Sequence, residues 1–270
     1  MTSKLKRNDL CSCGSGQQYK YCCISKELKR RTVKSNEKCA DCGTHLEADL
    51  SEDFMNIVAS LEIPLKNFCK DNEFYWFGHS IVVSEMIEFG EKLRAGELTK
   101  QSIIQAYTNR LTRENAIAWV EDSVSLHKAF GSRISILRDA IGAHFDSKYT
   151  LSVPVLFAQI EGLIREIGGL ALEDKFRPTI STEIWNSRYL FGMSDNAQYF
   201  NAFITKLFQG QRNDQLFNRN TVLHGMNVTY DSQEWSLVLV LTVLEIRQFL
   251  WFEKKTVDMF AERVLSDVGR

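Results

Sequence analysis

The apolar residues from position 49 onward recur three and four places apart, and this spacing constrains the fold more than any other feature of the chain. Segments such as "SIIQAYTNRL" and "AIAWVEDSVSLHKAF" show it clearly. Positions three and four apart lie on one face of an α-helix, so the spacing predicts amphipathic helices. Strand-like alternation is scarce and the chain has only 3 prolines. We therefore expect an all-α fold built as a helical bundle.

Several local signals predict where helices begin and end. Pro154 fits the first turn of a helix, and Gly168 with Gly169 fits a helix end. In "DSQE", Asp231 is placed to cap the last helix, with Glu234 three residues on as its capping-box partner. Residues 170–180 are expected to form a loop.

The length and hydropathy of the chain predict a folded protein without membrane segments. With 270 residues, 44% of them hydrophobic, it can bury one large core or two modest ones. The opening "MTSKLKRNDLC" has charge but no apolar stretch of the secretory type. The most apolar span, 235–252, is interrupted by Glu245 and Arg247, so it is better explained as a buried helix. We expect a cytoplasmic protein with no membrane contact.

The first 48 residues are rich in cysteine and poor in large apolar side chains, so they need something other than burial to fold. In a reducing compartment, clustered thiols point to a metal rather than to disulfides. The segment "CSCGSGQQYKYCC" presents Cys11, Cys13, Cys22 and Cys23. Four thiolates in so short a segment can complete a tetrahedral zinc site. The sequence therefore predicts a structural zinc.

This cysteine-rich stretch resembles the SEC-C motif, a short zinc-binding module named after the C-terminal tail of the SecA translocation ATPase. The resemblance covers "RNDLCSCGSGQQYKYCC", residues 7–23, with all four ligand positions present. Leu10 and Ser12 stand where the family usually has prolines, and Gln17 and Gln18 where it is usually basic. The resemblance implies a zinc knuckle over residues 1–25 that contacts a protein partner or the ribosome.

A second group, "CADCGTH", offers Cys39, Cys42 and His45. The spacing of the two cysteines forms half of many zinc sites, but the other half is missing from the neighbourhood. Cys69 or a second subunit would have to complete a second zinc site. The alternative for Cys69 is a small core residue.

The basic side chains are concentrated at the start of the chain. Residues 1–40 hold ten lysines and arginines against Asp9, Glu27 and Glu37, a balance of +7, which leaves −8 for the rest of a chain with net charge −1. Such a head suits a polyanion such as RNA, and the alternative is a solvated linker. We expect a basic linker with the C-x-x-C pair over 26–48, a helical region of unassigned role over 49–146 and a second helical domain over 147–270.

A polar patch in "FNRNTVLHGMNVTY" precedes the most apolar helix and contains Arg219, Asn220 and His224. Five positions turn a helix by roughly 140°, so a straight helix would not aim the arginine and the histidine at one point. Either the helix bends or two chains share a site. The alternative is an ordinary helix junction with a packed histidine.

The pattern "RNTVLH" resembles the R-x(4-6)-H motif of the HEPN superfamily, all-α domains of which many are dimeric, metal-independent ribonucleases. The resemblance includes the upstream helix "QIEGLIREI" and covers roughly 149–250. It implies that Arg219, Asn220 and His224 form a site at a homodimer interface, and it makes Glu161 a candidate to orient the arginine or the histidine. The alternative role for Glu161 is a surface ion pair with Arg165, four residues on.

These residue types predict a reaction. His224 would act as general base on a ribose 2′-hydroxyl or as general acid toward the leaving 5′-oxygen, while Arg219 would bind the phosphate. The substrate would be RNA, cleaved to leave a 2′,3′-cyclic phosphate, and the family suggests a toxin or phage-defence effector. The alternative function is a non-catalytic adaptor that binds RNA, the ribosome or a protein through its zinc-containing head.

Overall fold

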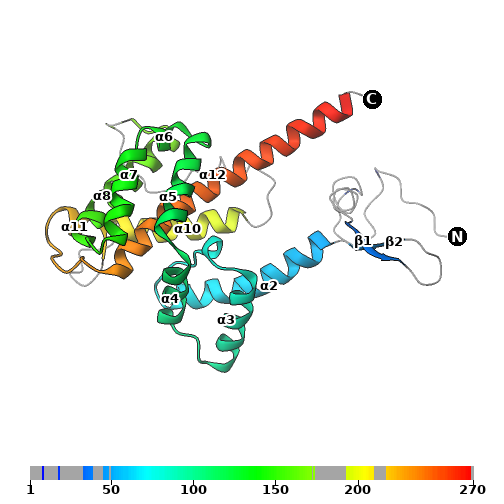
Figure 1. Cartoon of the computed structure of the whole chain (residues 1–270), viewed down its shortest axis with the longest axis horizontal. Helices are drawn as coiled ribbons and strands as arrows, with labels where there is room; N and C mark the ends of the chain where they lie inside the picture. The colour runs from blue at the N-terminus through cyan, green and yellow to red at the C-terminus, as the bar shows by residue number, and fades with distance from the viewer. Residues whose placement is uncertain are drawn as a thin grey trace. The chain divides into compact units, whose positions relative to one another are not determined.

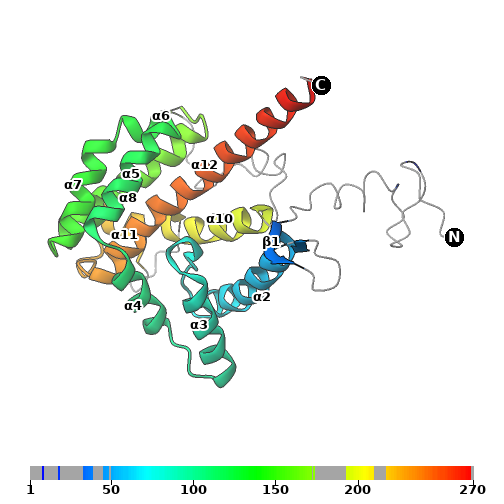
Figure 2. The same cartoon turned by 45° about the vertical axis from the view of Figure 1, so that its right-hand side comes forward.

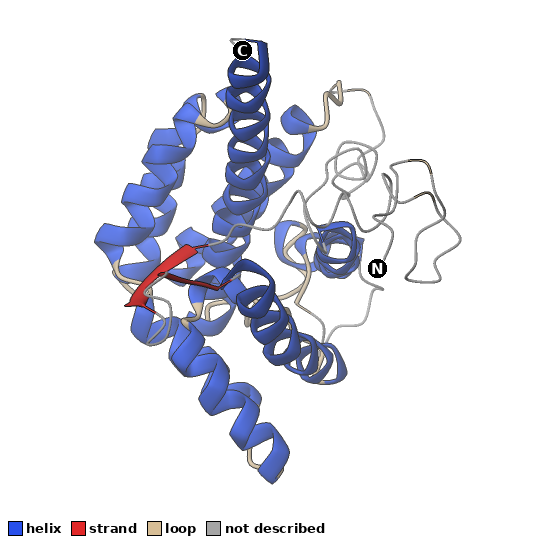
Figure 3. Ribbon diagram, turned by 90° about the vertical axis from the view of Figure 1, so that its right-hand side faces the viewer, coloured by secondary structure: helices blue, strands red, loops and turns tan. Residues whose placement is uncertain are grey.

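The computed structural model describes residues 8, 18, 33–38, 45–48, 50–171, 173, 193–209 and 217–268. The chain divides into two compact units, Met1–Pro64 and Leu65–Arg270. Every regular element described in the second unit is a helix (Figures 1 and 3), which confirms the predicted all-α class. The boundary expected at residues 146 and 147 falls inside this unit. Among the described residues, no helix is long and apolar enough to span a bilayer.

The first unit contains a short antiparallel strand pair, drawn red in Figure 3. Strand β1 (Val33–Lys38) pairs with β2 (His45–Ala48), with Val33 opposite Ala48 and Lys38 opposite His45. These strands lie in the segment expected to be a basic linker. Their sequences, "VKSNEK" and "HLEA", lack the apolar alternation that would have predicted them.

Helix α2 (Leu50–Asp71) spans the division between the units. The second unit then contains the following elements: η2 (Gly78–Ser80), α3 (Val83–Ala95), α4 (Lys100–Arg110), α5 (Arg113–Asp122), η3 (Ser123–Ser125), α6 (Lys128–Gly131), α7 (Ile134–Phe145), α8 (Tyr149–Ile167), α10 (Met193–Gln209), α11 (Arg219–Leu223) and α12 (Gln233–Val268).

Helix α12 forms the centre of the second unit. Every residue from Leu237 to Leu244 is buried, so this part of the helix is covered on all sides rather than on one face. Helices α5, α7 and α8 pack against it, and Figures 1 and 2 show them gathered beside its first half. The span expected to be a buried helix is therefore fully buried from Leu237 to Leu244, and half-buried Glu245 and Arg247 follow this section.

The partner of α12 with the largest buried face is α8. Its side chains Leu156, Phe157, Ile160 and Leu163 have no exposed surface. Their spacing of one, three and four positions places them on one side of the helix, as the sequence periodicity predicts. Glu161 lies at the edge of this buried face, one position after Ile160, and keeps 17% of its side chain exposed.

The helix ends confirm some predicted signals and correct others. Helix α8 ends at Ile167, with Gly168 as its C-cap and Gly169 at a φ of +66°, a conformation that suits glycine. Pro154 was predicted in the first turn, but it lies inside α8, which begins at Tyr149. The prediction that Asp231 caps α12 is also wrong by one residue.

The cap of α12 is Ser232, whose hydroxyl oxygen accepts a hydrogen bond from the Trp235 amide at 3.1 Å. This shift moves Glu234 out of the capping-box position. Its carboxylate instead lies 2.6 Å from the Lys100 ammonium group of α4. Asp231 and Ser232 are both residue types that cap helices. In the structure Ser232 is the cap, and Glu234 is free to pair with Lys100.

Candidate functional site

Helix α11 holds Arg219 at its first position. Buried Asn218 precedes the helix, and its side-chain oxygen accepts a hydrogen bond from the Thr221 amide at 3.0 Å. At the other end, Gly225 has a φ of +69°, and the amides of Met226 and Asn227 both donate to the Thr221 carbonyl at 2.9 Å. Five residues of helix are thereby fixed at both ends.

Glu161 of α8 meets Arg219 across the contact between α8 and α11. Its Oε2 lies 2.9 Å from Nη2 of Arg219, and its Oε1 accepts from Nε of Arg165 at 3.1 Å. Both roles considered for this carboxylate are therefore present in the structure. One carboxylate between two guanidinium groups fixes the arginine from α11 in place and leaves the cluster with a net positive charge.

The cluster extends to Asn220, whose Oδ1 accepts a hydrogen bond from Nη1 of Arg219 at 3.2 Å. Nε of Arg219 is buried and has no hydrogen-bond partner among the described residues. The arginine side chain as a whole keeps 30% of its surface exposed. It is therefore held on one side and accessible on another, which suits binding of an anion from solvent.

His224 does not join this cluster. It is the C-cap of α11 and is exposed, and in the described part of the chain its imidazole makes no hydrogen bond with Arg219, Asn220 or Glu161. Three large apolar side chains near it are also exposed: Leu223, Met226 and Val228. The structure thus brings three of the four predicted site residues together, while the fourth is exposed among neighbours in sequence that are also exposed.

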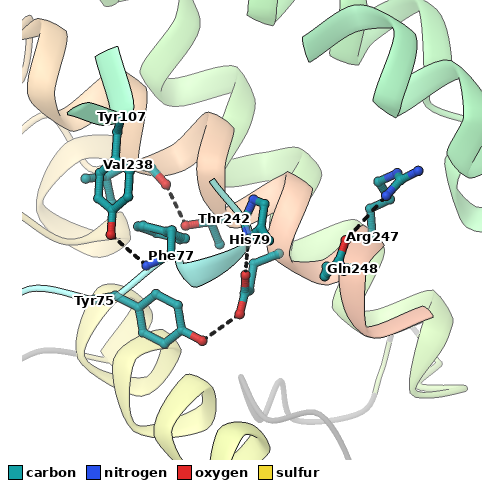
Figure 4. Close-up of polar contacts among 9 residues, drawn as sticks. Tyr75, Phe77, His79, Tyr107, Val238, Thr242, Arg247 and Gln248 are labelled. Carbon is teal, nitrogen blue, oxygen red and sulfur yellow. Dashed lines mark hydrogen bonds and ion pairs between the residues drawn. The ribbon is translucent and has the colours of Figure 1, made fainter. Parts of the chain in front are cut away.

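A second polar cluster in the same unit was missed by sequence reasoning (Figure 4). His79 and Tyr75 both contact Glu245 of α12: Nδ1 of His79 lies 2.5 Å from Oε2, and the Tyr75 hydroxyl donates to Oε1 at 2.7 Å. The histidine and the glutamate are 166 positions apart. Nothing local in "WFGHS" marks His79 as a member of a cluster.

The predicted zinc ligands Cys11, Cys13, Cys22 and Cys23 lie outside the described residues, as do Cys39 and Cys42 of the second group. His45 is the first residue of β2. The described residues contain no group of three side chains suited to holding a metal. The chemistry of four clustered thiolates still fits a zinc ion, because thiolates are its preferred ligands in structural sites.

Cys69 is described, and its side chain has no exposed surface. Burial raises the pKa of its thiol well above the usual value, which keeps the sulfur protonated. A buried, protonated thiol is typical of a small core residue, which was the alternative to a role for Cys69 as a zinc ligand.

Comparison with known proteins identifies one family. The SEC-C motif matches residues 7–24. Searches of curated proteins and of solved structures find no match to the chain. The match covers the first four cysteines and leaves the rest of the chain, including the second cysteine pair and the helical unit, unassigned.

Proposed function

We propose that this protein is an RNA endonuclease that needs no metal at the reacting phosphate, with a site formed by Arg219, Asn220 and His224. Glu161 positions the arginine. The main support is the 2.9 Å ion pair between Arg219 and Glu161. It joins the two segments, one on α8 and one on α11, that together resemble the HEPN pattern.

Arg219 supplies the phosphate-binding group. Its guanidinium is partly exposed, and Glu161 and Asn220 hold it through separate nitrogens, Nη2 and Nη1. A guanidinium fixed in this way binds a phosphate without first losing side-chain freedom, and its charge stabilises the extra negative charge of the transition state. Asn220 also offers an amide N–H group that can donate to the phosphate.

His224 supplies the proton transfers. Its exposed imidazole accepts the proton of a ribose 2′-hydroxyl as that oxygen attacks the adjacent phosphorus. The bond from phosphorus to the 5′-oxygen breaks, and a protonated imidazole donates to this leaving oxygen. The products are a 2′,3′-cyclic phosphate and a 5′-hydroxyl. DNA has no 2′-hydroxyl and is not a substrate.

The active form is a homodimer in which His224 of one subunit reaches the phosphate bound by Arg219 of the other. The exposed apolar side chains of Leu223, Met226 and Val228 support this arrangement, because all three lie within four positions of His224 and burying them against a second chain would favour association. A twofold contact places two such sites symmetrically.

The test is cleavage of total RNA by the purified protein, followed by analysis of the product ends. We expect 2′,3′-cyclic phosphates, no cleavage where the scissile nucleotide is 2′-deoxy, and activity that persists in EDTA while the protein keeps its zinc. Arg219→Ala and His224→Ala should each remove most activity and combine far less than additively, because the two residues act as one unit.

The matched controls are Arg165→Gln, which removes the other guanidinium on Glu161, and His127→Ala, which removes a half-buried imidazole elsewhere. Both should keep most of the activity. Products with a 5′-phosphate and a 3′-hydroxyl, formed only with added magnesium, would contradict the proposed chemistry.

The head is a zinc-binding SEC-C module in this proposal, with Cys11, Cys13, Cys22 and Cys23 as ligands, and its basic residues direct the protein to RNA or the ribosome. The match over residues 7–24 also favours a second function, a non-catalytic adaptor. Expression in a bacterial host separates the two. A toxin-like or defence nuclease slows growth and His224→Ala relieves it, whereas an adaptor gives equal growth in both cases.

A further inference from the structure

A pocket of about 310 Å³ lies in the second unit, beside the cluster in Figure 4. Its lining comes from η2, α5 and α12: His79, Trp119, Leu244, Arg247, Gln248 and Trp251. None of these residues belongs to the Arg219 cluster. The volume lies at the low end of the range of about 300–1,000 Å³ that is usual for small-molecule sites. It therefore suits one small ligand rather than a long polymer segment.

Arg247 gives the pocket a cation without a carboxylate partner. Its Nε donates to the Trp119 carbonyl at 3.1 Å and its Nη1 to the Gln248 side chain at 3.4 Å, and Figure 4 shows the guanidinium turned toward Gln248. Among the described residues, no carboxylate forms a direct ion pair with this guanidinium. Burial lowers the pKa of Arg247, and the charge of Asp122 opposes this only in part.

A partly buried guanidinium whose hydrogen bonds go to neutral acceptors, and on which Asp122 acts only through its charge, lacks part of the compensation that a directly bound anion would give it. An anion in the pocket would supply this compensation. Gln248 and the Trp119 carbonyl already fix the orientation of the guanidinium, so a bound anion would meet an arginine that is partly ordered beforehand.

His79 contributes a second unsatisfied group. Its side chain is only 10% exposed, and its Nε2 is buried with no hydrogen-bond partner among the described residues. Carboxylate oxygens accept hydrogen bonds, so the contact with Glu245 places a proton on Nδ1. Nε2 has almost no accessible surface, so a ligand in the pocket does not reach it while the ring keeps this position. His79 lines the pocket as a ring that Glu245 holds in one orientation.

The remaining lining is flat and apolar. Trp119 and Trp251 contribute indole rings, and Leu244 contributes an aliphatic side chain. Indole faces stack well on planar heterocycles, and such stacking on a nucleobase contributes about 1–3 kcal/mol per base. The pocket therefore combines aromatic lining residues for a planar ring with a cation for an anionic group.

We propose that this pocket binds a single nucleotide, with its phosphate at Arg247 and its base against the side chain of Trp119 or Trp251. The same chemistry is available from a free nucleoside monophosphate and from a terminal nucleotide of an RNA strand. This site is separate from the proposed nuclease site.

Isothermal titration calorimetry on the full-length protein tests the proposal, with the four ribonucleoside monophosphates, the corresponding nucleosides, inorganic phosphate and a short 5′-phosphorylated oligoribonucleotide as probes. At least one monophosphate or the oligonucleotide should bind. The matching nucleoside and inorganic phosphate should each bind at least tenfold more weakly. Equal affinity for free monophosphate and oligonucleotide assigns a free nucleotide as the ligand. Binding of the oligonucleotide alone assigns an RNA terminus if Arg219→Ala retains this binding and Arg247→Gln loses it, because the proposed nuclease site also binds RNA.

Two variants identify the pocket. Arg247→Gln should weaken binding at least tenfold. Gln248→Glu should also weaken binding at least tenfold, because the new carboxylate pairs with Arg247 and competes with the phosphate. The added ion pair also helps this variant to stay folded. The control is Arg94→Gln, since Arg94 also donates to a main-chain carbonyl, that of Gly90, but is exposed and lines no part of this pocket.

The nuclease proposal can fail without affecting this one. Arg219→Ala should retain full nucleotide binding, since Arg219 is not part of the pocket. The proposal is overturned if no monophosphate and no oligonucleotide binds the parent protein, or if folded Gln248→Glu binds as tightly as Arg94→Gln.

Discussion

His144 of α7 should make the protein lose stability as the pH falls below neutral. The imidazole is buried, with Nδ1 2.8 Å from the Ser236 hydroxyl of α12, and that hydroxyl donates to Ser152 of α8 at 2.9 Å. Burial lowers the pKa of His144 from 6.5 to about 4. This polar network connects the three helices at the centre of the second unit, so protonation of the ring acts on the main core.

The sign and size of the effect follow from proton linkage. Above pH 6.5 the ring is neutral in both states and the folded protein keeps its full stability. Between pH 6.5 and 4 the unfolded chain takes up a proton that the folded protein excludes, so the free energy of unfolding falls by about 1.4 kcal/mol per pH unit. The loss from His144 is about 2 kcal/mol at pH 5 and reaches about 3 kcal/mol near pH 4.

Urea unfolding, followed by far-UV circular dichroism at pH 7 and pH 5, measures this loss. His144→Gln keeps a polar side chain for Ser236 but cannot titrate, so its loss between the two pH values should be about 2 kcal/mol smaller than that of the parent protein. His224→Gln, which removes an exposed imidazole, should behave like the parent. Equal losses in the parent and His144→Gln would refute the reasoning.

Two further predictions concern the head and the helices. Purified protein should contain about one zinc per chain, or two if the second cysteine pair also binds, and Cys22→Ser with Cys23→Ser should lose one zinc by metal analysis while the helix signal persists. Gly142→Ala in α7 should stabilise the protein to urea by up to about 1 kcal/mol, because its Cβ would meet the nearest side chain at 3.8 Å. Gly162→Ala in α8 should show no such gain, because its Cβ would lie 2.7 Å from Nε of Arg133.

The sequence predicted correctly those features of the helices that depend only on neighbouring residues. Apolar spacing in α8 and the burial of Leu237 to Leu244 follow from the sequence, because a helix's face is fixed by its own periodicity. The Gly168 helix end was predicted for the same reason. The errors arose where two local solutions compete: Ser232 rather than Asp231 caps α12, and Pro154 is accommodated inside α8.

Contacts between distant segments were predictable only where a motif joined them. Glu161 and Arg219 became candidates together because one family pattern contains both, and the structure places them in an ion pair. Glu245 meets His79 and Tyr75 at separations of 166 and 170 positions, with no such pattern. Each of these residues is unremarkable within its own segment, so only the packing of η2 on α12 reveals the cluster.

The geometry of α11 gives the proposed dimer a test of its own. Asn218 and Gly225 fix both ends of this short helix, which holds Arg219 against Glu161. His224 is exposed, and within the described part of the chain it forms no hydrogen bond with that pair. If the histidine of one subunit serves the arginine of the other, a dimer of one Arg219→Ala chain and one His224→Ala chain contains one complete site and one site with neither residue.

Co-expression of the two inactive variants should therefore restore cleavage. With random pairing, half of the dimers are mixed and each has one of its two sites complete, so the preparation should reach about a quarter of the parent activity. A site formed within one chain gives a different result, because every chain then lacks one of the two residues and no pairing restores activity. Recovery well below a quarter, in a preparation whose mixed dimers are confirmed by differently tagged chains, would show that the two residues do not act across the interface.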